Sequence, residues 1–413
     1  MYVLYERCCG LDVHKKTVTA CLVVAGRQGK HDKTIREFGA STPDLLALRD
    51  WLLAAGCTHI AMESTGFYWK PVYNLLEDHF QVTLANAQHV RGLPGRKTDV
   101  GDAKWIADLL QHGLIRASFV PNRAQRELRE LTRYRKALIR ARTAEVNRIQ
   151  KVLTGANIKM DTVVTDMMGA SGRDMLAALM VGALQAQQMA DLARGRMRQK
   201  LEELEHALTG FMGAHQRFML AQQLAHIAIL QETIAACGDE IARRMRPWQD
   251  ALQRLCTIPG VGPRTAEVIL AEIGLDMSRF PTAHHLASWA GMCPGNRESG
   301  GKRLSGKTRK GNHWLRQALV ESAHAAKKAR QTYLAAQHRR LAARRGTNVA
   351  TVAVAHTILV IAYHILKNGT VYQELGAAYF DQRQPERVSR RMVKRLEAMG
   401  YRVTLETIHP TAV

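Results

Sequence analysis

Residues 8–120 alternate between short runs rich in β-branched residues and longer runs with helical spacing of apolar residues. The run 8–26 predicts two β-strands joined by a tight His-Lys-Lys turn. Thr42 stands before Pro43 as the expected N-cap of a helix that reaches residue 55, and Gly113 is expected to close the last helix. The other strands are predicted at 33–40, 59–65 and 81–87, and the other helices near 70–78 and at 99–113.

The resulting order is three strands, helix, strand, helix, strand, helix. Because the ribonuclease H type of fold has this order, an α/β domain of that type is expected for residues 1–120. The rest of the chain is expected to be all-α. It begins with a long basic helix at 122–155 and continues with mostly helical residues at 164–247.

Two apolar rhythms run through the helical middle of the chain. The first has 4-3-4-3 spacing, which is typical of a coiled-coil seam. A helical hairpin, a dimerising coiled coil and an ordinary packed helix pair all remain open. The first rhythm comprises Met197, Leu201, Leu204, Leu208 and Phe211, and the second comprises Leu220, Leu224, Ile227, Ile234 and Ile241.

Pro247 and Trp248 mark the expected start of a second compact helical domain, with a helix-hairpin-helix, that reaches about residue 370. Residues after 380 are polar and basic, as in a loosely packed tail. The predicted domains are therefore 1–120, 121–250, 251–375 and 376–413.

The charge balance narrows the function. The chain has 59 Lys and Arg against 36 Asp and Glu, a net charge of +23. Residues 291–346 contain 14 basic and 2 acidic residues, and residues 123–151 contain 10 basic and 3 acidic residues. Such clustering favours nucleic acid as the partner over an anionic membrane or a generally solvated basic surface.

Seven cysteines without a CxxC pair argue against a disulfide framework or a zinc knuckle, and indicate reduced thiols in the cytoplasm. Residues 1–10 lack the apolar core of a signal peptide. The apolar stretch 349–366 contains polar residues and is interpreted as a buried helix rather than a membrane span.

Four acids are candidate metal ligands: Asp12, Glu63, Asp99 and Asp102. A ribonuclease H type sheet brings their strands and helix to one edge, where clustered carboxylates would need divalent cations such as Mg²⁺. Two such ions can hold a scissile phosphate. Taken singly, each acid has an ordinary alternative as a turn cap, a surface ion-pair partner or a first-turn helix acid. His14 shares the strand face of Asp12, where a solvated turn histidine is the simpler interpretation.

The segment 258–274 has the pattern of a helix-hairpin-helix motif, with Gly260 and Gly262 ahead of an amphipathic helix. Free N–H groups at such a helix start can bind a phosphate, and Arg264 would assist. A plain Gly-Pro turn between helices is the alternative.

The segment 285–319 is rich in Gly, Ser, Lys and Arg, and predicts a loop between two helices that wraps a phosphate backbone. Ser299, Ser305 and Thr308 are candidate nucleophiles, and the residues alone do not choose among them. No adjacent Asp-His pair supports a hydrolase triad. A purely electrostatic loop is the alternative. Its candidate nucleic-acid contacts are Lys302, Arg303, Lys307, Arg309, Lys310 and Arg316.

Five blocks in one order resemble a known family. They are GLDVHKKT (10–17), AMESTGFYWKPV (61–72), GRKTDVGDAKWIADLL (95–110), IPGVGPRTA (258–266) and the run 286–316. They are similar to insertion-sequence transposases with an N-terminal DEDD domain of RuvC type and a C-terminal serine domain, described as bridge-RNA-guided recombinases. The helical middle, 156–250, is longer than in the shorter members of that family.

The resemblance implies that Asp12, Glu63, Asp99 and Asp102 are the DEDD metal ligands, with Mg²⁺ as cofactor, and that Ser299 forms a covalent phosphoserine link to DNA. It also implies strand exchange through a junction intermediate, and two chains that share one active site. The expected partners are donor and target double-stranded DNA, an element-encoded guide RNA and further copies of the chain, as a dimer or tetramer. The expected location is the bacterial cytoplasm, at the nucleoid.

Two other functions stay open on the residues alone. One is a RuvC-like metal-dependent endonuclease that uses water as the nucleophile, for which Ser299 would be dispensable. The other is a non-enzymatic DNA- or RNA-binding protein, for which Asp12 and Asp102 would matter only to local stability.

Overall fold

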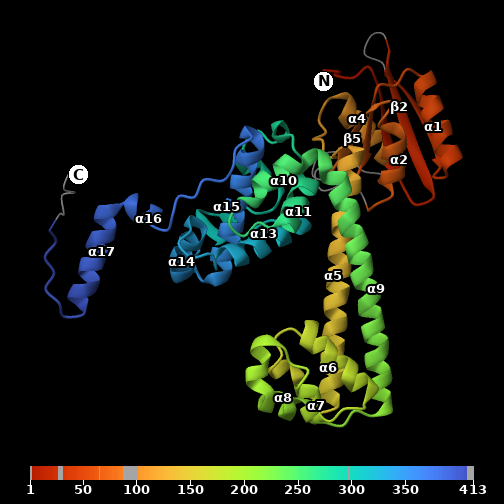
Figure 1. Ribbon diagram of the computed structural model, residues 1–413. Helices are drawn as coiled ribbons and strands as arrows, with labels where there is room; N and C mark the ends of the chain where they lie inside the picture. The colour runs from red at the N-terminus through yellow and green to blue at the C-terminus, as the bar shows by residue number, and fades with distance from the viewer. Residues whose placement is uncertain (1, 27–30, 65, 87–100, 296, 407–413) are drawn as a thin grey trace. The chain divides into compact units, whose positions relative to one another are not determined.

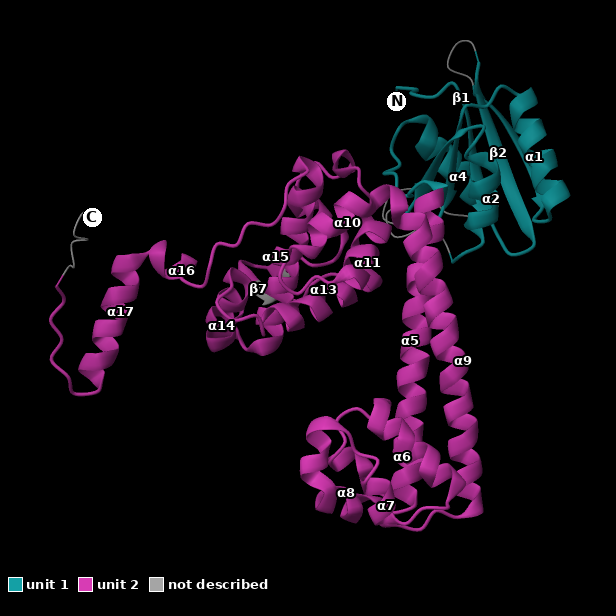
Figure 2. Cartoon of the chain, in the orientation of Figure 1, with its two compact units in different colours: residues 1–123 teal, residues 124–413 magenta. Residues whose placement is uncertain are grey.

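The computed structural model describes residues 2–26, 31–64, 66–86, 101–295 and 297–406 (Figure 1). The chain divides into two compact units, residues 1–123 and 124–413 (Figure 2). Unit 1 contains a mixed sheet with helices, and unit 2 is mostly helical.

Unit 1 is built on a five-stranded sheet with the order β3-β2-β1-β4-β5. The first three strands pair antiparallel, and β1, β4 and β5 pair parallel. The strands are β1 (Arg7–Val13), β2 (Thr17–Ala25), β3 (His31–Gly39), β4 (His59–Glu63) and β5 (Gln81–Ala85).

Helices cover both faces of this sheet. The helices α1 (Thr42–Ala54) and α2 (Trp69–Leu76) pack on the face that carries Leu11 and Ile60. The helix α4 (Asp102–Gln111) packs on the opposite face, against Cys8 and Ala61. Alternate residues of each strand enter the two cores, as period-2 geometry requires.

The predicted order of elements in this region is confirmed, with boundaries shifted by one to three residues. The predicted N-cap is wrong, because Ser41 holds that position and Thr42 is the first helical residue. Pro43 within the first turn suits either assignment, so the sequence did not distinguish them. Gly113 follows the C-cap of α4 with φ 68°, as predicted.

The two edges of the sheet differ. The outer edge of β5 is partly covered, since Ala85 bridges Ala117 and Ser118 N donates to Leu84 O at 2.7 Å. The strand β3 forms the other edge, and most of its residues are exposed.

Two long helices dominate the first half of unit 2: α5 (Arg123–Gly155) and α9 (Ala214–Met245), which lie side by side (Figure 1). They run antiparallel, because Glu127 pairs with Arg244 at 2.5 Å and Glu145 with His226 at 3.1 Å. Four of the five residues of the second apolar rhythm are buried on α9 within this one chain: Leu220, Ile227, Ile234 and Ile241. A helical hairpin is therefore the correct interpretation of that rhythm.

The first rhythm is not a coiled-coil seam. Met197 lies in a 3-10 helix (Gly195–Lys200), Leu204 and Leu208 are buried in the short helix α8, and Phe211 is 87% exposed. Leu204 and Leu208 belong to a compact apolar cluster that also contains residues of both long helices, and Met197 and Leu201 pack against it. The other elements there are a 3-10 turn (Met160–Thr162), α6 (Ala170–Val181), α7 (Ala186–Ala190) and α8 (Leu201–Leu208).

A 3-10 turn (Arg246–Trp248) leads into the helical C-terminal part. Its elements are α10 (Gln249–Cys256), α11 (Pro263–Ile273), a 3-10 turn (Met277–Arg279), α12 (Ala283–Trp289), β6 (Arg297–Ser299), β7 (Lys302–Ser305), α13 (His313–Ala326), α14 (Tyr333–Arg345), α15 (Thr347–Asn368), α16 (Tyr379–Gln382) and α17 (Pro385–Ala398).

The apolar stretch near residue 350 is the core helix α15, which packs against α12, α13 and α14. It is the one helix of the described chain that is long and apolar enough to cross a membrane, and half of its most apolar window is buried inside the protein. The prediction of a buried helix is confirmed.

Candidate functional site

The sheet of unit 1 brings Asp12 and Glu63 to neighbouring positions. The parallel register pairs Leu11 of β1 with Met62 of β4, so the next residues along the two strands are these acids. Residues two positions earlier, Gly10 and Ala61, also pair. Since Ala61 belongs to the core under α4 and side chains alternate along a strand, both acids belong to the face that α4 covers.

Close packing places the start of α4 beside the same strand. A Cβ added to Gly10 would lie 2.2 Å from the Ala103 carbonyl oxygen and 2.4 Å from the Ala107 nitrogen. Only glycine allows the helix backbone this near to β1. Asp102, the first residue of α4, is half-buried at that end of the helix.

The other two predicted ligands are Asp99 and Asp102. Asp102 starts the helix on the face of Asp12 and Glu63, whereas Asp99 lies outside the described residues. Among residues 2–26, 31–64, 66–86 and the described part beyond 100, no group of three or more His, Cys, Asp or Glu side chains is close enough to hold one metal ion. Asp12, Glu63 and Asp102 nevertheless suit a hard divalent cation in donor type and in their common face.

His14 lies against Asp12 instead of pointing only to solvent. Its Nε2 is 3.1 Å from Asp12 Oδ2, and the Asp12 side chain is 21% exposed while that of His14 is 65% exposed. Both residues stand where β1 turns into β2. This hydrogen bond orients the Asp12 carboxylate.

The serine-bearing segment is a β-hairpin, not the loop that was expected. The strands β6 and β7 pair antiparallel across the two residues Gly300 (φ 57°) and Gly301 (φ 74°). Two consecutive positive φ angles define the type of tight turn that favours Gly-Gly between paired strands. That dipeptide was the available signal, and the surrounding polar residues obscured it.

The hairpin presents Ser299 at its tip. The register places Lys302 directly opposite, so the two side chains emerge on the same face. Both residues are exposed. An accessible hydroxyl beside a cation is an arrangement that can approach a phosphodiester and stabilise its added charge.

The other candidate hydroxyls are placed differently. Thr308 is half-buried, and its Oγ1 accepts a hydrogen bond from Arg316 Nη1 at 2.6 Å. The same Arg316 nitrogen donates to Gly291 O at 3.1 Å, so this arginine ties the ends of the hairpin segment together. The side chains of Ser305 and Arg303 lie outside the described residues. The predicted nucleic-acid contacts Lys302, Lys307, Arg309 and Lys310 are all exposed.

The two glycines of the predicted helix-hairpin-helix have separate roles in the structure. Gly260 (φ 88°) faces α13, where an added Cβ would lie 2.4 Å from Ser322 O. Gly262 is the N-cap of α11, and an added Cβ there would meet open space. Arg264 is exposed in the first turn of α11. The α11 N-terminus is thus accessible, while Gly260 serves packing.

Two models of transposase families match the sequence of this chain. A model of the DEDD transposase domain matches residues 9–158, and a model described as transposase of the IS116/IS110/IS902 family matches residues 252–339. The two models describe one family, and together they cover more than half of the chain. The chain belongs to the IS110/IS116/IS902 transposase family.

Relatives along most of the chain agree with this assignment. A probable family 20 transposase of Pseudomonas aeruginosa is 27% identical over 88% of this chain and 94% of its own length. The transposase for insertion sequence element IS1111A of Coxiella burnetii is 27% identical over 78% of this chain and 80% of its own. The transposase for insertion sequence element IS1328 of Yersinia enterocolitica is 24% identical over 84% of this chain and 94% of its own length. The protein is therefore a transposase, an enzyme that cleaves and joins DNA.

One residue of the transposase that sequence reasoning missed is Glu272, which is fully buried at the end of α11. Arg133 of α5 donates to both of its carboxylate oxygens at 2.8 Å, and Asn312 Nδ2 donates to Oε2 at 2.7 Å. Asn312 is also the N-cap of α13, accepting from Trp314 N and Leu315 N. Through Asn312, Glu272 is therefore linked to the start of α13, seven residues after the end of β7.

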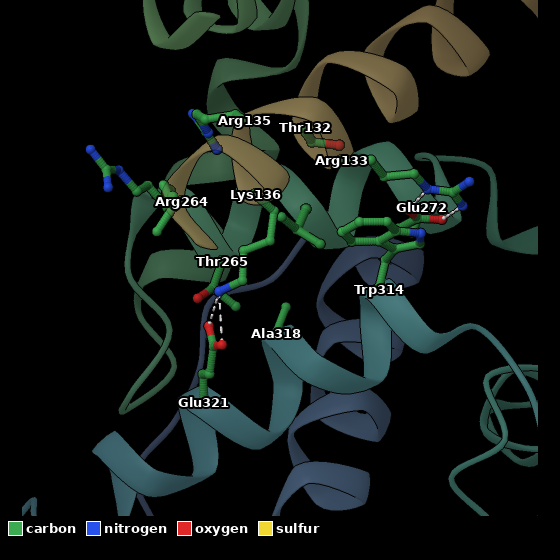
Figure 3. A pocket seen from close by; sticks show the side chains of 12 residues that line it. Thr132, Arg133, Arg135, Lys136, Arg264, Thr265, Glu272, Trp314, Ala318 and Glu321 are labelled. Atoms are coloured by element: carbon green, nitrogen blue, oxygen red, sulfur yellow. Dashed lines mark hydrogen bonds and ion pairs between the residues drawn. The ribbon is translucent and has the colours of Figure 1, made fainter. Parts of the chain in front are cut away.

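Around this ion pair, α5, α11 and α13 enclose a pocket of about 220 Å³ (Figure 3). Lys136 spans it to reach Glu321 at 2.8 Å, and the Trp314 ring lies beside the Arg133–Glu272 pair. Nearby, burial lowers the pKa of Arg129 to about 10, although the Glu272 carboxylate opposes that shift. These contacts link α5 to α11 and α13.

Proposed function

We propose that this transposase cleaves and rejoins DNA through a covalent intermediate on Ser299. The observation that carries the proposal is the place of this serine at the tip of a two-residue hairpin, exposed and opposite Lys302. Thr308 is a weaker candidate because its hydroxyl already accepts from Arg316.

In the proposed reaction, Ser299 Oγ attacks the phosphorus and forms a P–O bond as the P–O bond to one deoxyribose breaks. The serine proton passes to solvent, and the departing deoxyribose oxygen takes up a proton. A hydroxyl of the second DNA then attacks the phosphoserine and regenerates Ser299. Lys302 and its exposed basic neighbours would stabilise the charge on the five-coordinate phosphorus.

We propose Mg²⁺ as the cofactor, held by Asp12, Glu63, Asp99 and Asp102. A bound divalent cation would neutralise these carboxylates and polarise the phosphate oxygens. The residues' own contribution is to hold oxygen donors on one face of the sheet, with His14 orienting Asp12 at 3.1 Å. Membership of the DEDD transposase domain supports divalent-metal dependence in general.

The strand order of unit 1, with three antiparallel strands followed by two parallel ones, supports a ribonuclease H-like fold of RuvC type. The accessible N-terminus of α11 at Gly262 supports a helix-hairpin-helix that binds a DNA phosphate. We also propose that the domains of the chain meet at residues 120, 250 and 375.

Donor and target double-stranded DNA are the proposed substrates, an element-encoded RNA the proposed guide, and a dimer or tetramer the proposed assembly. The resemblance of the catalytic blocks supports these partners, and the net charge of +23 supports polyanion binding.

The alternative is a RuvC-like endonuclease that uses water as the nucleophile. The observation in its favour is that Asp12 and Glu63 share one face of unit 1 with the start of α4, and metal-assisted hydrolysis at such a site would need no serine.

The deciding experiment compares Ser299→Ala with Ser305→Ala, a serine of the same hairpin. End-labelled donor DNA is incubated with each protein and Mg²⁺, and protein-linked DNA is separated on a denaturing gel. Ser299→Ala is expected to lose all adducts and still bind DNA, while Ser305→Ala retains them. Adducts that persist in Ser299→Ala would overturn the assignment of Ser299 as the nucleophile. Linear cut products from that variant would establish the mechanism with water as the nucleophile.

A further inference from the structure

A second basic feature of unit 2 stands apart from the serine hairpin. It is a groove of about 500 Å³ between α14 on one side and α16 with α17 on the other (labelled in Figure 1). Arg339, Arg340 and Arg344 line the first wall, and Arg387 and Arg391 the second. Asp381 is the one acid among the lining residues that the structure describes. We call this feature the arginine groove.

Aromatic contacts hold the two walls together. The rings of Tyr333 in α14 and Phe380 in α16 stack at 5.1 Å with an interplanar angle of 18°. Arg340 lies 5.4 Å from the centroid of Phe380 and 3.8 Å from Asp381. Arg340 therefore serves to join the walls, and its charge is partly balanced.

The other four arginines have no such partner. Arg339, Arg344, Arg387 and Arg391 are exposed and form no ion pair with any carboxylate of the described chain. Four like charges around one groove repel one another, so a polyanion in the groove would be stabilised by all of them. Guanidinium groups bind phosphate through two parallel hydrogen bonds, which suits arginine better than lysine for this task.

The spacing of the charges suits a phosphate backbone rather than a single small anion. Arg387 and Arg391 are four residues apart on α17, which places them roughly 6 Å apart along one helix face. Phosphates of one DNA strand recur roughly every 3.4 Å along the duplex axis, so the pair can reach phosphates about two nucleotides apart. Arg339 and Arg344 extend the contact along the opposite wall.

We propose that the arginine groove binds the phosphodiester backbone of duplex DNA, independently of base sequence, as an additional anchor outside the catalytic residues. The proposal rests on the protein's action on DNA and not on the identity of the nucleophile. Duplex DNA is favoured because the enzyme must hold it, and because arginines that contact only phosphates need no base-reading partner.

The test compares two double variants from the same short segment. Arg387→Gln/Arg391→Gln removes two groove charges, whereas Arg383→Gln/Arg390→Gln removes two charges from residues that do not line the groove. Arg383 is exposed at the C-cap of α16, and no described residue of α17 is buried, so neither variant should disturb folding. Binding of the full chain to a labelled DNA duplex of unrelated sequence is measured by fluorescence anisotropy over a range of salt concentrations.

The groove variant is expected to bind about tenfold more weakly at moderate salt, with a log–log salt dependence reduced by about 2. The control should stay within about twofold of the wild type. Equal losses in both variants, or no loss in the groove variant, would overturn the proposal. So would a loss seen with duplex RNA and not with DNA. Adduct formation at saturating DNA should survive in the groove variant, so a failure of the serine mechanism is distinguishable from a failure of the groove.

Discussion

Four cysteine side chains of unit 1, Cys8, Cys9, Cys21 and Cys57, lie inside the protein. Burial raises the pKa of Cys8 from its usual 9.0 to about 12, and it raises the pKa of Cys57 to about 12 as well. Since the thiolate is the reactive form, these side chains act as small apolar core residues and not as nucleophiles or metal ligands.

Their burial predicts how stability depends on pH. In the unfolded chain the Cys8 and Cys57 thiols lose their protons near pH 9, whereas in the folded protein they keep them to about pH 12. The unfolded state is therefore favoured as pH rises through this window, by at most about 1.4 kcal/mol per pH unit for each thiol. Denaturant unfolding at pH 8 and pH 10 should show the loss of stability, and Cys8→Ala/Cys57→Ala should reduce that loss without abolishing it, since burial also raises the pKa of Cys9 and Cys21.

A matched control is Cys237→Ala, which removes a half-exposed thiol from α9. It should leave the difference between the two pH values as in the wild type. A wild-type stability that is constant or rises over this range would contradict the assignment.

At the residue scale, the sequence could name the hydroxyl candidates but could not rank them without the family resemblance. The contacts that separate Ser299 from Thr308 come from Arg316 and Gly291, which meet only in the folded chain. Glu272 shows the same limit, because a single glutamate in an amphipathic helix gives no sign that Arg133, 139 residues away, will pair with it.

At the scale of elements, the two glycines between α10 and α11 should lose stability to different extents when each is changed to alanine. Gly260→Ala forces a Cβ at φ 88° to within 2.4 Å of Ser322 O, and should cost about 2 kcal/mol or more of unfolding free energy. Gly262→Ala meets open space and should cost less than about 1 kcal/mol. Denaturant titrations of both variants measure the difference.

The same pair separates packing from binding. If the α11 N-terminus binds a phosphate, Gly262→Ala should weaken DNA binding while it folds normally. A larger loss of unfolding free energy in Gly262→Ala than in Gly260→Ala would contradict the roles given to the two glycines in the turn between α10 and α11.

Helices with one continuous spacing of apolar residues could be predicted from the sequence. Segments in which the helix axis changes direction could not. The helix α5 follows from its unbroken spacing over 33 residues. The expected seam from Met197 to Phe211 failed because a 3-10 helix ends at Lys200, whose φ of −126° starts a new helix axis at Leu201. Apolar spacing carries no information about such a change of axis.

At the scale of the whole molecule, each compact unit has its own apolar cores, so the two should unfold as separate cooperative units. Gly10→Ala tests this, because its Cβ would clash with α4 at 2.2 Å within unit 1. Amide hydrogen exchange should show lost protection across β1 and α4, and unchanged protection in unit 2. DNA cleavage should also fall, since Asp102 starts the displaced helix.

Gly155→Ala is the matched control, because an added Cβ at the end of α5 meets nothing within 4 Å. It should leave exchange in both units as in the wild type. Loss of protection that spreads from Gly10→Ala into α10–α15 would instead mean that the chain unfolds as one unit.

The exposed edge strand β3 has a consequence for solubility at high concentration. Its outer backbone groups could extend the sheet into that of a second molecule, which is the first step of ordered aggregation. The charged side chains of Asp32, Lys33, Arg36 and Glu37 along this strand oppose such growth. These four charged residues therefore oppose polymerisation of the protein, and their replacement by apolar residues would promote aggregation during production before it altered transposition.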